Sequence, residues 1–240
     1  MKKLLLSILV SAGFVAPAFA TLQLSADING TVFNCADQTV CDLDATVGKL
    51  RIADLFLGGV EVIGSSQIQI IGPSNALNTS SFQIINHNMT AATIQLAING
   101  IDFLGPVASY SASGAGTWQN ANGSSIDLSF YGDASNTQGA NTPADLPGVL
   151  LAGFSDIANG PADSFAFNKT GPFVAGGAFG MSLGTSGTLA AWTGVPGTEP
   201  TLVGRSQTIL ATNGAFVPEP GTLMLLGAAL LGLGAIRRRT

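Results

Sequence analysis

The sequence predicts an all-β body, an antiparallel β-sandwich or jelly roll over residues 21–212, with a hydrophobic segment at each end of the chain. Three observations support this fold class. No twelve-residue window of the body shows helical periodicity, and Lys and Glu, both good helix formers, are nearly absent from it. Short β-rich runs alternate apolar and polar residues. Gly, Asn, Asp and Pro separate these runs. A β-solenoid is the alternative, but no fixed internal period requires it.

Two hairpins are predicted at the start of the body. Asn29-Gly30, a dipeptide that adopts the positive φ angles of a tight turn, separates β-rich runs at 21–28 and 31–35. Gly58-Gly59 separates runs at 50–57 and 60–63 in the same way. The further predicted strands are 67–71, 82–86, 93–98, 126–130, 149–154, 164–167, 180–183, 188–192 and 207–211. Residues 133–147 are predicted to form a polar surface loop.

The N-terminal residues 1–20 predict a signal peptide. Lys2 and Lys3 precede a short apolar stretch, which ends in the small-x-small sequence Ala18-Phe19-Ala20. We expect signal peptidase to cleave after Ala20 and to leave Thr21 as the new N-terminus. A stable N-terminal membrane anchor is the alternative, but the apolar stretch is shorter than the about 20 residues that a spanning helix needs.

The C-terminal residues combine three features in a fixed order. Residues 213–217 form a linker, Pro218-Glu219-Pro220 follows, and an apolar segment at 222–236 precedes Arg237, Arg238 and Arg239. The apolar segment predicts a transmembrane helix of about 22 Å, shorter than the about 30 Å of a hydrocarbon core. The arginines should remain cytoplasmic, which would place the body on the other side of the membrane.

This order of features in residues 217–240 resembles the PEP-CTERM sorting signal (residues 218–240 here) of Gram-negative, exopolysaccharide-producing bacteria. In that family a membrane enzyme, exosortase, is thought to recognise the Pro-Glu-Pro element and to process the protein for export to the surface. The resemblance covers a tenth of the chain. It implies an exosortase-like partner, a place at the cell surface or in the extracellular matrix, and an association with exopolysaccharide. A permanent single-span anchor is the alternative.

The charges of the body argue against a nucleic-acid partner. Residues 21–217 carry thirteen acidic residues and four basic ones, Lys49, Arg51, Lys169 and Arg205, which gives a net charge of −9. Four scattered cations cannot neutralise a run of phosphates, on which the affinity of nucleic-acid-binding proteins depends.

Cys35 and Cys41 are the two cysteines of the chain, and they predict a structural disulfide. An exported protein enters an oxidising compartment, where two cysteines this close normally pair. A metal or redox role would need more ligands or a Cys-x-x-Cys spacing.

The acidic excess raises the question of Ca²⁺, which binds carboxylate oxygens. The candidate ligands are Asp37, Asp42, Asp44, Asp127, Asp133, Asp145, Asp156 and Asp163. Their spacing is not that of an EF-hand loop, so turn-forming and solubilising aspartates are the favoured interpretation, and no cofactor is predicted. Asp127 and Asp133 would act as a glycosidase pair only if their separation fitted that mechanism.

Other candidate site residues are few. Trp118 is the speculative sugar contact, because aromatic faces bind apolar sugar surfaces; core packing is the alternative for it and for Trp192, Tyr110 and Tyr131. His87, the sole histidine, is expected to be a surface or turn residue, so no catalytic residue is predicted. The sequence therefore favours an exported, non-enzymatic surface or matrix protein. The alternatives are a carbohydrate- or Ca²⁺-binding module, a membrane-anchored surface protein and, least favoured, a secreted hydrolase.

Overall fold

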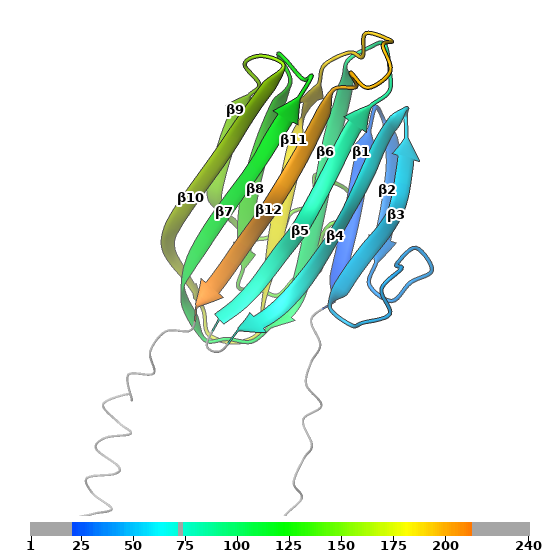
Figure 1. Cartoon of the computed structure of the whole chain (residues 1–240). Helices are drawn as coiled ribbons and strands as arrows, with labels where there is room; N and C mark the ends of the chain where they lie inside the picture. Colours follow the sequence, from blue (N-terminus) through cyan, green and yellow to red (C-terminus); the bar gives the residue numbers. More distant parts are fainter. Residues whose placement is uncertain (1–20, 72–73, 213–240) are drawn as a thin grey trace, which may run out of the picture.

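A computed structural model describes residues 21–71 and 74–212, which form two facing antiparallel sheets (Figure 1). The front sheet has the strand order β10-β7-β12-β5-β4-β3, and the back sheet has the order β2-β1-β6-β11-β8-β9. The strands are β1 (Leu22–Ile28), β2 (Thr31–Ala36), β3 (Lys49–Leu57), β4 (Val60–Ile71), β5 (Ser74–Asn86), β6 (Ala92–Phe103), β7 (Val107–Gln119), β8 (Ser125–Asp133), β9 (Val149–Ile157), β10 (Ala162–Ala175), β11 (Phe179–Leu189) and β12 (Thr201–Thr212). The predicted all-β sandwich is confirmed.

The predicted terminal elements lie outside the described residues. These are the signal peptide at 1–20 with its cleavage site, the linker at 213–217, and the sorting signal with its helix at 222–236. Within residues 21–71 and 74–212, no helix has the length and apolar character needed to cross a membrane.

Both predicted hairpin turns are present. Asn29 and Gly30 have φ angles of 52° and 80°, and they connect β1 to β2. Gly58 and Gly59 have φ angles of 54° and 75°, and they connect β3 to β4. Most residues adopt such positive φ angles only with steric strain, which is why glycine and asparagine occupy these positions.

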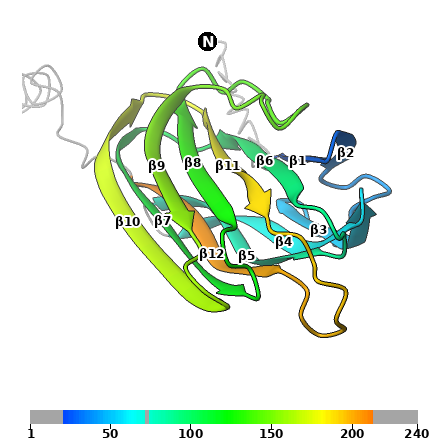
Figure 2. The ribbon, with the colours of Figure 1, turned by 90° about the horizontal axis from the view of Figure 1, so that it is seen from above.

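The core lies between the two sheets, whose layers are seen end-on in Figure 2. Alternate residues of each strand point inward, as the period of a β-strand requires. Trp118 of β7, Phe130 of β8 and the stacked pair Phe103 and Phe179 are the largest fully buried side chains. A sandwich this well filled leaves its outer faces and its loops as the places for function.

Several strands differ from the sequence prediction. The predicted strands at 60–63 and 67–71 are one strand, β4, and those at 180–183 and 188–192 are joined in β11, which ends before Trp192. Strand β7 was not predicted at all. Its inward positions include Gly114 and Gly116, and the ring of Phe165 from β10 fills the space beside Gly116 that a side chain would need. In the same way, the ring of Phe82 from β5 occupies the space that a side chain at Gly204 of β12 would need.

Candidate functional site

A groove of about 570 Å³ lies on the outer face of the front sheet. Its walls come from β3, β4, β5 and β12, and they include Arg51, Ser65, Ser81, Gln83 and Val203. Phe82, the one aromatic residue of this lining, is only 8% exposed because its ring faces the core. The groove therefore offers hydroxyl, amide and guanidinium groups to a ligand.

The register of the strands places these groups in line across the sheet. Arg51 of β3 is opposite Ser65 of β4, which is opposite Ser81 of β5. Arg205 lies in a bulge of β12 between Gly204 and Ser206, beside the same part of β5. Neighbouring strands are about 4.8 Å apart, so the backbones that carry Arg51 and Arg205 are separated by about 14 Å.

A second polar row crosses the whole front sheet nearby. Its members are cross-strand partners from all six strands: Lys49, Gln67, Asn78, Thr208, Ser113 and Asn168. Thr208 donates a hydrogen bond to the Oδ1 of Asn78 at 3.0 Å. The face is thus rich in uncharged hydrogen-bonding groups.

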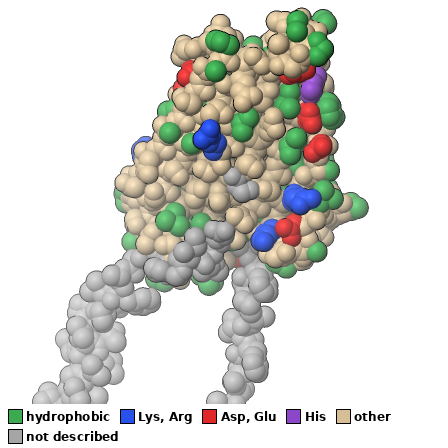
Figure 3. Space-filling view, in the orientation of Figure 1, with side chains coloured by type: hydrophobic (Ala, Val, Ile, Leu, Met, Phe, Trp, Pro, Cys, Tyr) green, Lys and Arg blue, Asp and Glu red, His purple; other side chains and the backbone are tan. Residues whose placement is uncertain are grey.

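The charged residues are divided unequally between the two sheets. Lys49 and Arg51 of β3, Lys169 of β10 and Arg205 of β12 all belong to the front sheet, and all four are exposed. The strands of the back sheet carry no Lys or Arg within the described residues; their charged residues are Asp27, Asp102, Asp127, Asp133 and Asp156. The front sheet also carries three acidic residues, Asp54 of β3, Glu61 of β4 and Asp163 of β10. Figure 3 shows the face of the molecule that the front sheet presents, with basic and acidic side chains among uncharged ones.

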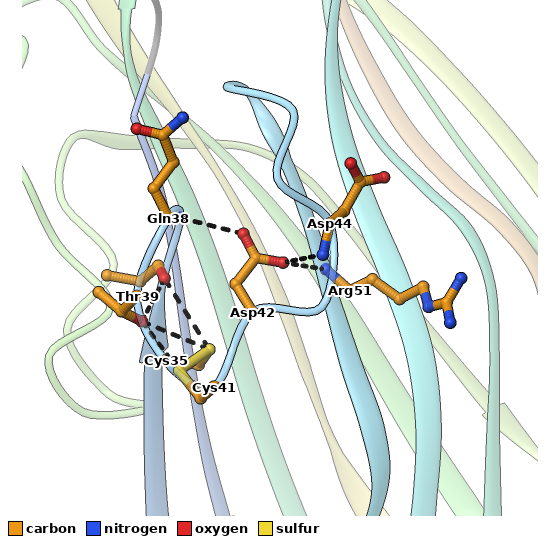
Figure 4. The surroundings of a disulfide bond; sticks show 8 residues. Cys35, Gln38, Thr39, Cys41, Asp42, Asp44 and Arg51 are labelled. Carbon is orange, nitrogen blue, oxygen red and sulfur yellow. Dashed lines mark hydrogen bonds between the residues drawn. A yellow bond between two sulfur atoms is a disulfide. The ribbon is translucent and has the colours of Figure 1, made fainter.

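The loop between β2 and β3 contains the predicted disulfide. Cys35 and Cys41 are joined, with their Cα atoms 5.8 Å apart (Figure 4). Cys35 is 2% exposed and belongs to the hydrophobic core, so the disulfide fixes the loop to the edge of the sandwich. The prediction of a structural disulfide is confirmed.

The aspartates around this disulfide bind the loop backbone. Asp42 accepts hydrogen bonds from the backbone N–H groups of Gln38, Asp44 and Arg51, at 2.9–3.0 Å (Figure 4). The backbone N–H of Thr46 donates to Asp44, and this hydrogen bond, with one from the Thr46 side chain, lowers the pKa of Asp44. Their oxygens therefore organise the turn, which is the role favoured for them from the sequence.

The other candidate calcium ligands are also engaged in local contacts. The backbone N–H of Gly48 donates to Asp37, that of Asn159 donates to Asp163, and Asn141 donates to Asp145. Hydrogen bonds from Asn159 and Ser164 lower the pKa of Asp163. In the part of the chain that the structure describes, no three His, Cys, Asp or Glu side chains gather closely enough to hold a metal ion.

The structure corrects the expectation that Trp118 contacts a sugar. Its ring is 1% exposed and packs near Phe165, with the centroids 6.1 Å apart, and its Nε1 donates a hydrogen bond to Asp156 at 2.8 Å. Tyr110 is also buried, and its hydroxyl donates to the backbone oxygen of Leu151. Trp192 lies in the loop after β11, where its Nε1 donates to the backbone oxygen of Val195. These aromatic side chains do not form one surface platform.

Two catalytic hypotheses can be judged from the geometry. Asp127 and Asp133 lie six residues apart on β8, a separation of about 20 Å along a strand, whereas the carboxyl groups of a glycosidase pair are about 5–9.5 Å apart. The glycosidase pair is therefore wrong. His87 lies just after β5, where its Nε2 is 3.0 Å from an oxygen of Glu61 and its ring stacks on that of Phe56. This half-exposed contact is consistent with the surface position expected for His87.

Comparison with known proteins identifies the C-terminal segment. Residues 216–239 match the PEP-CTERM protein-sorting motif. The chain carries a PEP-CTERM sorting signal. The match contains Pro218, Glu219, Pro220 and the three arginines at 237–239, so the resemblance stated from the sequence is confirmed. A search of curated proteins finds no match to the chain.

Solved structures similar to the PEP-CTERM chain are distant from it. TmCBM61 in complex with β-1,4-galactotriose is 10% identical, with 63% of this chain and 88% of that chain covered and a TM-score of 0.33. A structure of infectious bursal disease virus, Gt strain, is 10% identical, with 83% and 57% covered and a TM-score of 0.32. A carbohydrate-binding module of the β-sandwich superfamily is 10% identical, with 78% and 72% covered and a TM-score of 0.29. Likenesses of this strength carry no argument about what the chain binds.

Proposed function

We propose that this chain is an exported, non-enzymatic protein of the cell surface or extracellular matrix, sorted by an exosortase-type enzyme and associated with exopolysaccharide. The observation that carries the proposal is the PEP-CTERM sorting motif at residues 216–239. The N-terminal sequence is consistent with it, because residues 1–20 have the charge, apolar stretch and cleavage site of a signal peptide.

The disulfide adds independent support for a place outside the cytoplasm. Disulfides persist in oxidising compartments and are rare in the reducing cytosol. The Cys35–Cys41 pair is formed with its Cα atoms at an ordinary separation, so the fold accommodates the bond without rearrangement. A body built to contain this bond suits an exported protein.

The proposal that the body is not an enzyme rests on how its reactive side chains are used. His87, the sole histidine, binds Glu61 and Phe56 at the surface. Asp127 accepts a hydrogen bond from Ser155, and Asp133 accepts from the backbone N–H groups of Ser135 and Thr137. Structural contacts account for each of them, so no catalytic role is needed to explain their positions.

Cell fractionation tests the sorting proposal. The triple substitution Pro218→Ala, Glu219→Ala and Pro220→Ala removes the element that exosortase is thought to recognise. We expect the unaltered protein at the surface or in the medium, and the variant in the membrane fraction with its tail attached. The double variant Pro196→Ala and Glu199→Ala changes the same residue types in the exposed loop before β12, and it should behave like the unaltered protein. The same distribution for the triple variant and the unaltered protein would refute the proposal.

A further inference from the structure

We propose that the outer face of the front sheet, along the groove that Arg51 lines and toward Arg205 of β12, binds an acidic polysaccharide, meaning a glycan that carries carboxylate groups. The inference deepens the proposed function, on which it rests, because it names the surface and the chemical class of the glycan. The proposed function places no condition on the charge of the exopolysaccharide, whereas this inference requires the bound glycan to be anionic.

The distribution of charge is the first argument. A body with a net charge of −9 repels an anionic polymer from most of its surface. The front sheet is the exception, because its strands carry all four basic residues of the body against three acidic ones, Asp54, Glu61 and Asp163. Among the described residues one salt bridge is present, between His87 and Glu61, so none of these four side chains is neutralised by a salt bridge. Arg51 and Arg205 are both exposed, and the carboxylate of Asp44 interacts electrostatically with Arg51 without forming a salt bridge.

The arrangement of groups within the groove is the second argument. Arg51 lines the groove on β3, and Arg205 lies beside the groove on β12, about 14 Å from Arg51 by strand spacing. Ser65 and Ser81 lie on the two strands between them, and Gln83 also lines the groove. A guanidinium forms strong paired hydrogen bonds with a carboxylate. Hydroxyl and amide groups pair with sugar hydroxyls. Across the strands, an anion-binding side chain thus lies at each end of this row, with hydroxyl-binding side chains between them.

The acidic residue of the groove fits the same ligand. Asp54 lines the groove where β3 bulges out of register with β4. Its carboxylate accepts hydrogen bonds from hydroxyls but repels a second anion close to it. A ligand must therefore place its carboxylates toward the two arginines and a hydroxyl near Asp54, which favours a polymer that carries both groups.

The same reasoning disfavours a nucleic acid on this face. Duplex DNA carries a charge about every 1.7 Å, far denser than two arginines about 14 Å apart can match. Proteins that bind single strands stack the bases on aromatic side chains, and the one aromatic residue lining this groove is buried against the core.

Binding of defined polymers to the full-length chain in detergent micelles tests the proposal. Polygalacturonate supplies the carboxylates, and neutral galactan serves as the uncharged probe. We expect the protein to bind polygalacturonate, to bind it more weakly as salt rises, and not to bind galactan. The double variant Arg51→Gln and Arg205→Gln should lose at least about tenfold in affinity, because two charge-assisted contacts are removed. Lys169→Gln makes a matched change outside the groove and should alter affinity less than about twofold.

Several results would overturn the proposal. They are binding of galactan as tight as that of polygalacturonate, no binding of polygalacturonate, an unchanged affinity in the double variant, and equal binding of single-stranded DNA. An unaltered melting temperature of the double variant, whose side chains are exposed, would show that it still folds. These outcomes are independent of the sorting experiment, because purified protein can fail to bind while cells still sort it, and the reverse.

Discussion

Asp37 occupies an unfavourable place for a charge in the loop between β2 and β3. Its Oδ2 accepts a hydrogen bond from the backbone N–H of Gly48 at 2.7 Å, but its Oδ1 is buried without a partner. Burial raises the pKa of Asp37 above its ordinary value of 3.8, and the neighbouring charge of Asp42 raises it further, although the Gly48 bond acts in the opposite direction. The native state therefore binds the proton of Asp37 more tightly than the unfolded chain does.

The substitution Asp37→Asn should stabilise the protein at neutral pH. Because the pKa of Asp37 is raised in the folded state, its protonated form favours folding. Its contribution to the free energy of unfolding is therefore fully present below the pKa of the unfolded chain, and it is lost as pH rises through the pKa of the folded state. An amide keeps an acceptor for Gly48 and carries no charge near Asp42. Asp37 is only partly buried and solvent screens its charge, so we expect a gain in melting temperature on the order of 1–2 °C at pH 7.

Thermal unfolding at two pH values checks this expectation. The difference between Asp37→Asn and the unaltered protein should shrink at about pH 3, where the carboxyl group of Asp37 is protonated in both states. A variant that is less stable at pH 7, or a gain that is the same at both pH values, would contradict it.

At the scale of the strands, the sequence predicted elements where large apolar residues alternate and missed them where glycine faces the core. The hairpins around Asn29-Gly30 and Gly58-Gly59 were predicted because their turn chemistry is local. Strand β7 was missed because its inward residues at 114 and 116 are glycines. Side chains of other strands exclude a larger residue at these positions, as the ring of Phe165 does beside Gly116. Such complementarity is a property of pairs of strands and does not show in one strand's pattern.

The candidate site was missed for a related reason. Arg51, Ser65, Ser81 and Arg205 are widely spaced in the sequence, and only the pairing of β3, β4 and β5 with β12 brings them into one row across the front sheet. The four basic residues were described as scattered along the chain, and the structure places all four on strands of the front sheet. Trp118 was nominated because aromatic residues bind sugars, but the sequence does not show on which side of a strand it points.

The disulfide acts at the scale of elements, because it constrains the connection between an edge strand of the back sheet and one of the front sheet. The double substitution Cys35→Ser and Cys41→Ser should destabilise the body by on the order of 2 kcal/mol, which lowers the melting temperature by roughly 4–8 °C. Reduction of the unaltered protein should give a similar loss, measured by thermal unfolding with and without a reductant. A melting temperature unaffected by both treatments would show that the hydrogen bonds of Asp42 hold the loop without the disulfide.

At the scale of the whole molecule, the two ends of the described body lie at the same end of the sandwich (Figure 1). Strand β1 begins, and β12 ends, at the same lower end of the sandwich in Figure 1. The signal peptide predicted from the sequence and the C-terminal sorting signal therefore connect to the body at the same end, and the groove of the front sheet lies on a side wall of the sandwich. A body attached to a membrane through either end could still present this wall to the medium.

This arrangement makes the processing of the two ends separable from the folding of the body. All the paired strands of the two sheets lie between Leu22 and Thr212. Removal of residues 1–20 and of the arginines at 237–239 should therefore leave the sandwich intact. We expect mass spectrometry of the surface-associated protein to find Thr21 as the first residue and to find no peptide that contains Arg237–Arg239. The cytosolic precursor serves as the control and should contain both ends. Recovery of the arginine tail in all of the surface-associated protein would instead indicate permanent anchoring, and the PEP-CTERM segment would then act as an anchor rather than as a processing signal.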